Sequence, residues 1–519
     1  RRLGGAAAGL VATILYASEP NILAHAALAT SDMAAVFFLL GSASVFWWQL
    51  DRPTPARIAA SVALFGLACV AKYSAVLLVP LFVGLLVWRW GQEPAWRPRA
   101  PRLVATLVLT HAAGAVAIIW LFYGFKFSGF SPALPGAERY LVRWEEILPY
   151  IGWQQHVVQW CRDWKLLPDP FLYGYAWVLQ AARARASFLA GEVGLYGWTS
   201  FFPLAFLWKS TEALLAGLAA ALVGVLHRWS RDRRRIAADL FLTAPLILFC
   251  AIYAAVSLAS HLNIGHRHIL PLYPALFAAV GCWAASLPGV WRRLVPGLLL
   301  AAHGLAVVTI APHFLAYFNR LAGGPANGYR LLVDSSLDWG QDLPGLRDWL
   351  ERNNSGPEAQ PVFLSYFGSG EPAYYRLPVQ RLPFINGFKL PQPWYELRPG
   401  LYCISATMLQ QVYTGVGGPW SDAFEKEYQE LRQLEPGFRD YLTRPEVRPV
   451  LLQLAPAEKW EAGWRRYDKL RFARLCQVLR RREPEAMAGY SILIYRVSAA
   501  ELGFALGGDL RPPAAASGQ

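Results

Sequence analysis

The sequence predicts a mainly α-helical membrane protein, in which a polytopic bundle of transmembrane helices is followed by a small α/β domain. Three observations support this fold class. Of the 519 residues, 55% are hydrophobic and only 16% are charged, whereas a soluble domain carries about 25% charged residues. The apolar residues cluster before residue 311. The 22 Trp and 23 Tyr belong to residue types that favour membrane–water interfaces.

Nine apolar runs are candidates for membrane spans, because a helix needs about 20 apolar residues to cross a bilayer. They cover 3–18, 33–50, 58–71, 74–90, 103–123, 202–227, 238–257, 269–286 and 294–311. The third run is short, and Lys72 lies between it and the fourth, so these two runs predict a hairpin. We therefore expect a transmembrane domain over residues 1–311.

Arginines in the short connections predict the orientation of the spans, because cytoplasmic loops are enriched in Lys and Arg. Four connections are rich in arginine: 51–57, 89–102, 228–235 and 288–293. If the spans alternate, all four lie on the cytoplasmic side. The outer side then holds Asp32, Lys72, the loop 124–201, the turn 258–268 and everything from residue 312.

The long outer loop and the tail predict structure outside the bilayer. Segments 138–165 and 171–190 are typical of amphipathic helices that lie along the interface. The tail, 312–519, alternates helix and strand patterns and predicts an extracytoplasmic α/β domain. Its expected helices cover 343–352, 407–413 and 465–481, and its expected strands cover 362–367, 401–405 and 490–497.

The net charge of +14 could indicate a nucleic-acid partner. Most arginines fall in the connections between apolar runs, so we expect membrane orientation and no nucleic-acid binding. The sequence contains no phosphate-binding P-loop and no dinucleotide glycine motif, so we expect no nucleotide or organic cofactor. A disulfide among Cys161, Cys403 and Cys476 stays open, because nothing in the sequence pairs them.

Asp32 is the first candidate site residue. It lies between two spans, where an acidic side chain is costly and usually has a partner or a role. It could hold a divalent metal ion or position a basic group. Alternatively, Thr30, Ser31 or Asp32 could simply cap the following helix. His25, on the same outer stretch, is a candidate substrate contact.

Basic residues supply the second and third candidates. Lys72 at the hairpin apex could bind a lipid phosphate, or extend to water without a further role. His266, Arg267 and His268 crowd one outer turn. Arginine suits bidentate phosphate recognition, and we prefer this interpretation to a zinc site, because no carboxylate or cysteine lies beside the histidines. An ordinary interfacial turn is the remaining alternative.

Two aromatic segments are weaker candidates for substrate binding. One holds Glu192 and Trp198, with Lys209 further on; an interfacial aromatic belt would explain it equally well. The other holds Asp338, Trp339 and Gln341, which could grip a sugar or a peptide. Its alternative is a domain entry made of turn residues, with Asp338 or Asp342 capping a helix.

Three strings resemble the phospholipid-carrier-dependent glycosyltransferases of the GT-C membrane fold, which include protein O-mannosyltransferases and lipid A aminoarabinose transferases. They are LYASEPNILAHAALATSDMA, HLNIGHRHILPLYPAL and YFNRLAGGPANGYRLLVDSSLDWGQDL, and the resemblance covers nearly the whole chain. It implies a hexosyl- or pentosyltransferase of a bacterial inner membrane. Its expected partners are membrane lipid, a polyprenyl-phosphate-linked sugar and an extracytoplasmic lipid, protein or glycan acceptor.

The resemblance also implies roles for single residues. Asp32 matches the family's second acidic position, which helps to bind a metal or a basic donor group, and we expect Asp32 to be a catalytic residue. Lys72 matches the basic residue of a short helical hairpin, and Arg267 matches the basic outer turn that meets the lipid phosphate. The family's first outer loop, with its Asp/Glu motif, has no counterpart here. We therefore expect the first two helices and that loop to be missing, and the chain to be catalytically incomplete.

Two other classes of function remain open at this point. A transporter or flippase of a lipid-linked saccharide would need polar residues within the spans and inverted repeats, and neither is clear in the sequence. A non-catalytic membrane scaffold would tolerate loss of Asp32 and Arg267.

Overall fold

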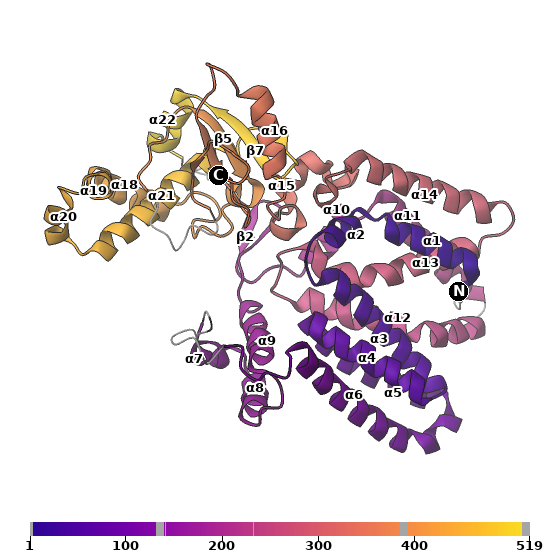
Figure 1. Cartoon of the computed structure of the whole chain (residues 1–519). Coiled ribbons are helices and arrows are strands. Elements are labelled where there is room, and N and C mark those ends of the chain that lie inside the picture. The colour runs from indigo at the N-terminus through magenta and orange to yellow at the C-terminus, as the bar shows by residue number, and fades with distance from the viewer. Residues whose placement is uncertain (1–3, 131–139, 141, 232, 385–392, 511–519) are drawn as a thin grey trace, which may run out of the picture. The chain divides into compact units, whose positions relative to one another are not determined.

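The computed structural model describes residues 4–130, 140, 142–231, 233–384 and 393–510. The chain forms two compact units (Figure 1). Unit 1 comprises Arg1–Arg185 and Tyr196–Phe314, and unit 2 comprises Ala186–Leu195 and Leu315–Gln519. The predicted boundary at 311/312 lies three residues from this division. The sequence analysis did not anticipate that 186–195, which lies within the outer loop, would belong to unit 2.

Unit 1 is a bundle of long apolar helices. Among the described residues, seven helices are long and apolar enough to cross a membrane, or eight if the bent pair α1–α2 is one span. Together with shorter helices, the bundle contains α1 (Gly5–Ala17), α2 (Pro20–Ala27), α3 (Asp32–Asp51), α4 (Pro55–Ala71), α5 (Leu78–Gln92), α6 (Ala100–Phe122), α10 (Phe201–Lys209), α11 (Glu212–Arg231), α12 (Arg233–Ala259), α13 (Tyr273–Ala285) and α14 (Trp291–Ile310). The predicted fold class, a mainly α polytopic bundle, is confirmed.

Two predicted spans are interrupted. The run 3–18 continues, after a bend of 58°, into α2. The prediction of one helix over 202–227 was wrong, because α10 ends at Lys209 and α11 begins at Glu212. Ser210, between them, has an extended backbone, and its hydroxyl shares a 2.8 Å hydrogen bond with the hydroxyl of Tyr273. The polar pair Ser210 and Thr211 therefore makes buried tertiary contacts at the break.

Small residues allow neighbouring helices to approach closely, as is common between membrane helices. A Cβ on Gly114 of α6 would lie 2.1 Å from Val62 Cγ1 of α4. A Cβ on Gly281 of α13 would lie 2.4 Å from the carbonyl oxygen of Ala8 in α1. These two pairs, α4–α6 and α1–α13, pack side by side along the bundle (Figure 1).

The predicted interfacial helices are shorter than expected. Segment 138–165 contains α7 (Trp144–Ile147), a 3-10 helix (Leu148–Tyr150) and α8 (Gln154–Asp163). Segment 171–190 contains all but the first two residues of α9 (Asp169–Ala181), followed by a strand. Gly152 and Lys165, both with positive φ, lie at the breaks. Trp153, just before α8, is 72% exposed, and Trp160 on α8 is 56% exposed. Exposed rings of this kind suit an interfacial surface.

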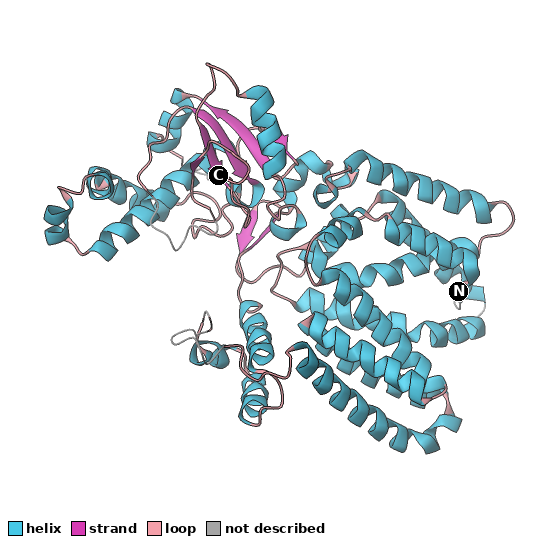
Figure 2. Cartoon of the chain, viewed as in Figure 1, coloured by secondary structure: helices cyan, strands magenta, loops and turns pink. Residues whose placement is uncertain are grey.

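Unit 2 is an α/β domain around a mixed five-stranded sheet of order β4-β3-β5-β7-β6 (Figure 2). Strand β3 (Val362–Ser365) is parallel to β4 (Gln380–Arg381) and β5 (Gly400–Ser405), and β7 (Ile492–Val497) is antiparallel to β5 and to β6 (Ala486–Ala488). Helix α16 (Leu343–Asn353) packs its leucines on one face of this sheet. A separate hairpin joins β1 (Ser187–Leu189) to β2 (Glu192–Gly194).

The helices of unit 2 were only partly predicted. The helix expected over 465–481 is longer, α21 (Ala457–Leu479), and the one expected over 407–413 is a single turn, α17 (Ala406–Leu409). Four helices were not anticipated: α18 (Asp422–Gln433), α19 (Glu435–Thr443), α20 (Arg448–Leu454) and α22 (Ala499–Gly507). Two of these helices carry local sequence signals for their first turns. Ser421 caps α18, and Ser498 forms a capping box with Glu501 in α22. None of the six cysteines forms a disulfide, so Cys161, Cys403 and Cys476 are not linked to one another.

Candidate active site

Three charged side chains from distant parts of unit 1 meet at one point. Lys72 Nζ donates a hydrogen bond of 2.5 Å to Asp32 Oδ1, and Arg267 Nη1 donates one of 3.2 Å to Asp32 Oδ2. The Asp32 side chain is 1% exposed, whereas those of Lys72 and Arg267 are 20% and 18% exposed. One buried carboxylate therefore carries two cations that remain partly accessible.

Each of the three residues lies where a helix begins or ends. Asp32 is the first residue of α3, where the helix dipole stabilises a negative charge. Lys72 has an extended backbone between α4 and a 3-10 helix, η1 (Tyr73–Leu77). Arg267 lies in the 3-10 helix η4 (His266–Leu272) that precedes α13. The capping alternative is not favoured, because Ser31 is the N-cap of α3 and makes no side-chain capping bond.

The cluster lies at helix ends that are opposite the arginine-rich connections. Helix α3 begins at Asp32 and ends at Asp51, next to the connection 51–57. Helix α4 begins just after this connection and ends at Ala71, next to Lys72. Helix α13 follows Arg267 and leads to the connection 288–293. The contacts among the three residues are thus those expected if the connections 51–57 and 288–293 share the other side of the bundle.

Two buried histidines lie near this cluster. Both His25 and His268 are within electrostatic reach of Asp32, Lys72 and Arg267. Among the described residues, neither His25 Nδ1 nor His268 Nε2 has a hydrogen-bond partner. His266 differs from them, because its Nε2 lies 2.7 Å from the hydroxyl of Tyr273. Of the two histidines predicted to bind phosphate, His268 is therefore beside the cations, and His266 shares a hydrogen bond with Tyr273.

Lys209 belongs to a second buried polar group, which the sequence analysis did not identify. Its charge acts on Glu19, and Asn21 Nδ2 bonds both Glu19 Oε1 (2.8 Å) and the carbonyl oxygen of Lys209 (2.7 Å). Glu19 Oε2 lies 4.0 Å from His303 Nε2. Glu19 and His303 interrupt apolar runs, and polar residues within spans are functional candidates in general, so this signal was present in the sequence.

The predicted metal role of Asp32 does not fit this geometry. Both of its oxygens accept hydrogen bonds from cationic groups. Throughout the part of the chain that the structure describes, no three His, Cys, Asp or Glu side chains are grouped so that they could hold a metal ion. A divalent cation usually needs several oxygen ligands at once. We therefore assign Asp32 no metal and derive no step through one.

Comparison with known families finds a likeness for the first part of the bundle that carries this cluster. Residues 1–120 match the family model of the dolichyl-phosphate-mannose-protein mannosyltransferases. The match indicates a membrane glycosyltransferase of the mannosyltransferase type and confirms the predicted GT-C resemblance. No curated protein and no solved structure matches the chain. Two of the three clustered residues, Asp32 and Lys72, lie within the segment that matches the mannosyltransferase family.

Glu192 and Trp198, predicted to form one sugar-binding surface, belong to different units. Glu192 begins β2 and is exposed in unit 2. Trp198 lies in unit 1, where its backbone N–H donates a 2.5 Å hydrogen bond to Asn263 Oδ1.

Asp338, Trp339 and Gln341 form an inward-facing turn in unit 2. The Gly340 N–H donates to Asp338 Oδ1 (2.9 Å), and the Trp339 N–H donates to Gln341 Oε1 (2.8 Å). Asp342 is the N-cap of α16 but makes no capping bond; it accepts hydrogen bonds from Ser491 (2.7 Å) and Gln341 (2.8 Å) instead. These contacts favour the domain-entry interpretation over a sugar grip, although the expected capping bond is absent.

The carboxyl groups of this turn are held in an apolar environment. Burial raises the pKa of Asp338 well above its usual range, and the nearby charges of Asp342 and Asp334 raise it further. Burial also raises the pKa of Asp342 to about 6. Asp338 therefore favours its neutral form, which suits a structural role.

Proposed function

We propose that this protein transfers a sugar from a polyprenyl-phosphate donor to an acceptor outside the cytoplasm, and that Lys72 and Arg267 bind the donor phosphate. The observation that carries the proposal is the pair of partly exposed cations on one buried carboxylate. The family matched by residues 1–120 uses dolichyl-phosphate mannose, according to its description. This supports a hexosyl donor, mannose first, over a pentosyl donor.

The geometry supports a positioning role for Asp32. Its oxygens already bond Lys72 and Arg267, so it is not an unengaged base. A fixed carboxylate between them reduces their mutual repulsion and holds both cations toward one space. Preorganised cations of this kind stabilise the charge that develops on a leaving group.

The reaction itself needs a leaving group and a proton acceptor. The bond between the anomeric carbon and the phosphate oxygen breaks, and the phosphate keeps the electron pair. The acceptor hydroxyl forms the new bond and releases a proton. Neutral imidazole can take such a proton, and His25 Nδ1 and His268 Nε2 are two ring nitrogens beside the cations without a partner among the described residues. We assign the proton to this pair.

A charge-removing variant with a charge-preserving partner tests the proposal. In membrane vesicles carrying the full-length protein and a radiolabelled polyprenyl-phosphate mannose, we expect Lys72→Gln to lower kcat/KM about 100-fold, as removal of one preorganised group typically does. Lys72→Arg should retain most activity. Asp32 keeps Arg267 in the Lys72→Gln protein, so its folding should be preserved.

Asp51→Asn is the matched control. Asp51 lies at the other end of α3 and is 61% exposed, so its loss should leave transfer unchanged. Equal activity of Lys72→Gln and the unaltered protein would refute the phosphate-binding role. If the unaltered protein moves a fluorescent lipid-linked saccharide across the vesicle membrane without transferring its sugar, the flippase alternative replaces ours.

The remaining assignments belong to the same proposal. The arginine-rich connections support a multi-pass protein of a bacterial inner membrane, with unit 2 outside the cytoplasm. The acceptor is then a lipid, a protein or a glycan on that side. Accessibility of a single cysteine introduced into unit 2 to a membrane-impermeant thiol reagent, measured in intact cells, would test this orientation.

A further inference from the structure

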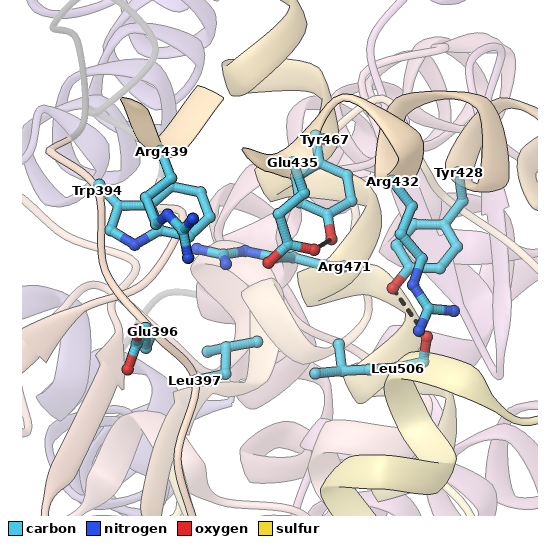
Figure 3. Close-up of a pocket in the computed structure, with 10 residues that line it drawn as sticks. All are labelled: Trp394, Glu396, Leu397, Tyr428, Arg432, Glu435, Arg439, Tyr467, Arg471 and Leu506. Atoms are coloured by element: carbon cyan, nitrogen blue, oxygen red, sulfur yellow. Dashed lines mark hydrogen bonds between the residues drawn. The ribbon is translucent and has the colours of Figure 1, made fainter. Parts of the chain in front are cut away.

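Unit 2 contains a cleft that none of the predicted residues line. Its volume is about 290 Å³, and its walls come from α18, α19, α21 and α22 and from the segment 394–397 (Figure 3). This volume is at the lower end of the range of about 300–1,000 Å³ for small-molecule sites. The cleft is thus sized for a small ligand.

Three arginines line this cleft, and they differ in how their charge is balanced. Arg471 is buried and donates to Asp468 Oδ1 at 2.8 Å. Arg439 has only a 3.6 Å contact with Asp440. Arg432 is exposed, and among the described residues its guanidinium has no hydrogen-bond or ion-pair partner. Two guanidinium groups are therefore available to an anion.

Aromatic rings form the rest of the wall. Tyr428 and Tyr467 are stacked, with centroids 5.7 Å apart and planes at 15°. Trp394 packs against Trp464 at 4.9 Å, and Arg471 lies 5.6 Å from the Trp394 ring. Tyr428 and Tyr467 are only 1% and 3% exposed, so the flat apolar surface of the wall comes mainly from the half-buried Trp394. Figure 3 shows Trp394, Tyr428 and Tyr467 with the three arginines around the cleft.

A carboxylate completes the set of polar groups. Glu435 accepts a 2.6 Å hydrogen bond from the Tyr467 hydroxyl and lines the cleft, where its other oxygen is a candidate acceptor for ligand hydroxyls. Glu396 also lines the cleft, but Arg398 outside it donates to this carboxylate at 2.9 Å. The lining thus combines two available cations, flat rings and one hydroxyl acceptor.

We propose that this cleft binds an anionic saccharide, namely one sugar ring that bears a phosphate or a carboxylate. The half-buried Trp394 would pack against the apolar face of the sugar, Glu435 would accept from its hydroxyls, and Arg432 with Arg439 would bind the anion. A bare anion would leave the rings unused, and a neutral sugar would leave the arginines unused. The site lies wholly within unit 2 and does not depend on the proposed transfer reaction.

Calorimetric titration of the full chain in detergent, without a polyprenyl donor, tests this site. The probes are a hexose 6-phosphate, glucuronate, the neutral hexose, inorganic phosphate and a nucleoside monophosphate. We expect the first two to bind, and the neutral hexose and inorganic phosphate to bind at least about tenfold more weakly, since each lacks half of the contacts. The relative affinity of the first two identifies the anion.

Exposed arginines allow variants that do not threaten folding. Arg432→Gln should weaken binding of the anionic sugar about tenfold, the usual effect of losing one charge-assisted hydrogen bond, and should leave the neutral hexose unchanged. Arg444→Gln is the matched control, because Arg444 is 54% exposed on the neighbouring segment and does not line the cleft.

Several outcomes would overturn the proposal. Inorganic phosphate that binds as tightly as the sugar phosphate would reduce the cleft to a simple anion site. Tighter binding of the nucleoside monophosphate would assign it to nucleotides. No binding of any probe at millimolar concentration, or equal loss in Arg432→Gln and Arg444→Gln, would leave no saccharide site at all.

Discussion

Two buried aspartates, one from each unit, lie in opposite environments. In unit 1, Asp32 is 1% exposed and bonds two cations, Lys72 and Arg267. In unit 2, Asp338 is equally buried, but its neighbours with charge are the carboxyl groups of Asp334 and Asp342. Burial alone therefore does not tell a functional carboxylate from a structural one.

The partners decide the difference. A buried carboxylate between cations keeps its charge and orders the groups around it. A buried carboxylate among other carboxylates takes up a proton and becomes a neutral hydrogen-bonding group. On this basis we attach chemistry to the cluster of unit 1 and structure to the turn of unit 2.

The largest expected effect comes from neutralising each aspartate in turn. Asp32→Asn should lower the free energy of unfolding by about 3 kcal/mol, because it leaves two cations together without their carboxylate. Asp338→Asn should change it by less than about 1 kcal/mol, because the neutral acid and the amide are similar in shape and charge. Thermal unfolding of the full chain in detergent measures both.

A second variant separates lost pairing from lost packing at Asp32. Asp32→Asn combined with Lys72→Gln should recover part of the stability, because only one cation, Arg267, then remains without its carboxylate. An equal loss in the single and double variants would show that charge balance does not stabilise the cluster, and the comparison with Asp338 would fail.

A change of pH should act on unit 2 with a defined sign. The pKa of Asp342 rises from its ordinary value of 3.8 to about 6 in the folded protein. Between these values the folded state holds a proton that the unfolded chain has released, so stability falls as pH rises. The expected loss between about pH 4 and 7 is on the order of 2 kcal/mol. Hydrogen exchange of the α16 and β7 amides measures it.

Asp342→Asn gives the control for this pH dependence. The amide does not titrate and can still accept the hydrogen bond of Ser491, so the slope between about pH 4 and 7 should decrease. The pKa of Asp338 is raised in the same direction, so some slope should remain. Stability that rises with pH over this range would contradict the assignment.

Sequence reasoning located the charged cluster of unit 1 because two simple signals agreed. The arginine-rich connections define one side of the bundle. Acidic and basic residues at the opposite ends of the same helices must then share the other side. Contact among Asp32, Lys72 and Arg267 was not itself derivable. It depends on how α3, α4 and η4 pack, which no local pattern encodes.

Other features were missed for identifiable physical reasons. The break between α10 and α11 was not predicted, because Ser210 and Thr211 are only two polar residues within a long apolar run. Their hydrogen-bond partners, Tyr273 and His303, come from other helices. The cleft of unit 2 gathers side chains from 394 to 506. Residues so far apart in the sequence share no spacing that a motif could reveal.

The smallest expected effect concerns an ion pair that lacks burial. Arg347 contacts Asp348 at 2.7 Å, much as Lys72 contacts Asp32, but the two side chains are 42% and 53% exposed. Water screens such a pair, so Arg347→Gln should leave the free energy of unfolding of unit 2 almost unchanged. Chemical denaturation at low and high salt measures this change. A loss as large as that of Asp32→Asn would mean that pairing matters regardless of solvent. Our reason for singling out the cluster of unit 1 is that its cations are tied to a carboxylate from which water is excluded, and that reason would then no longer hold.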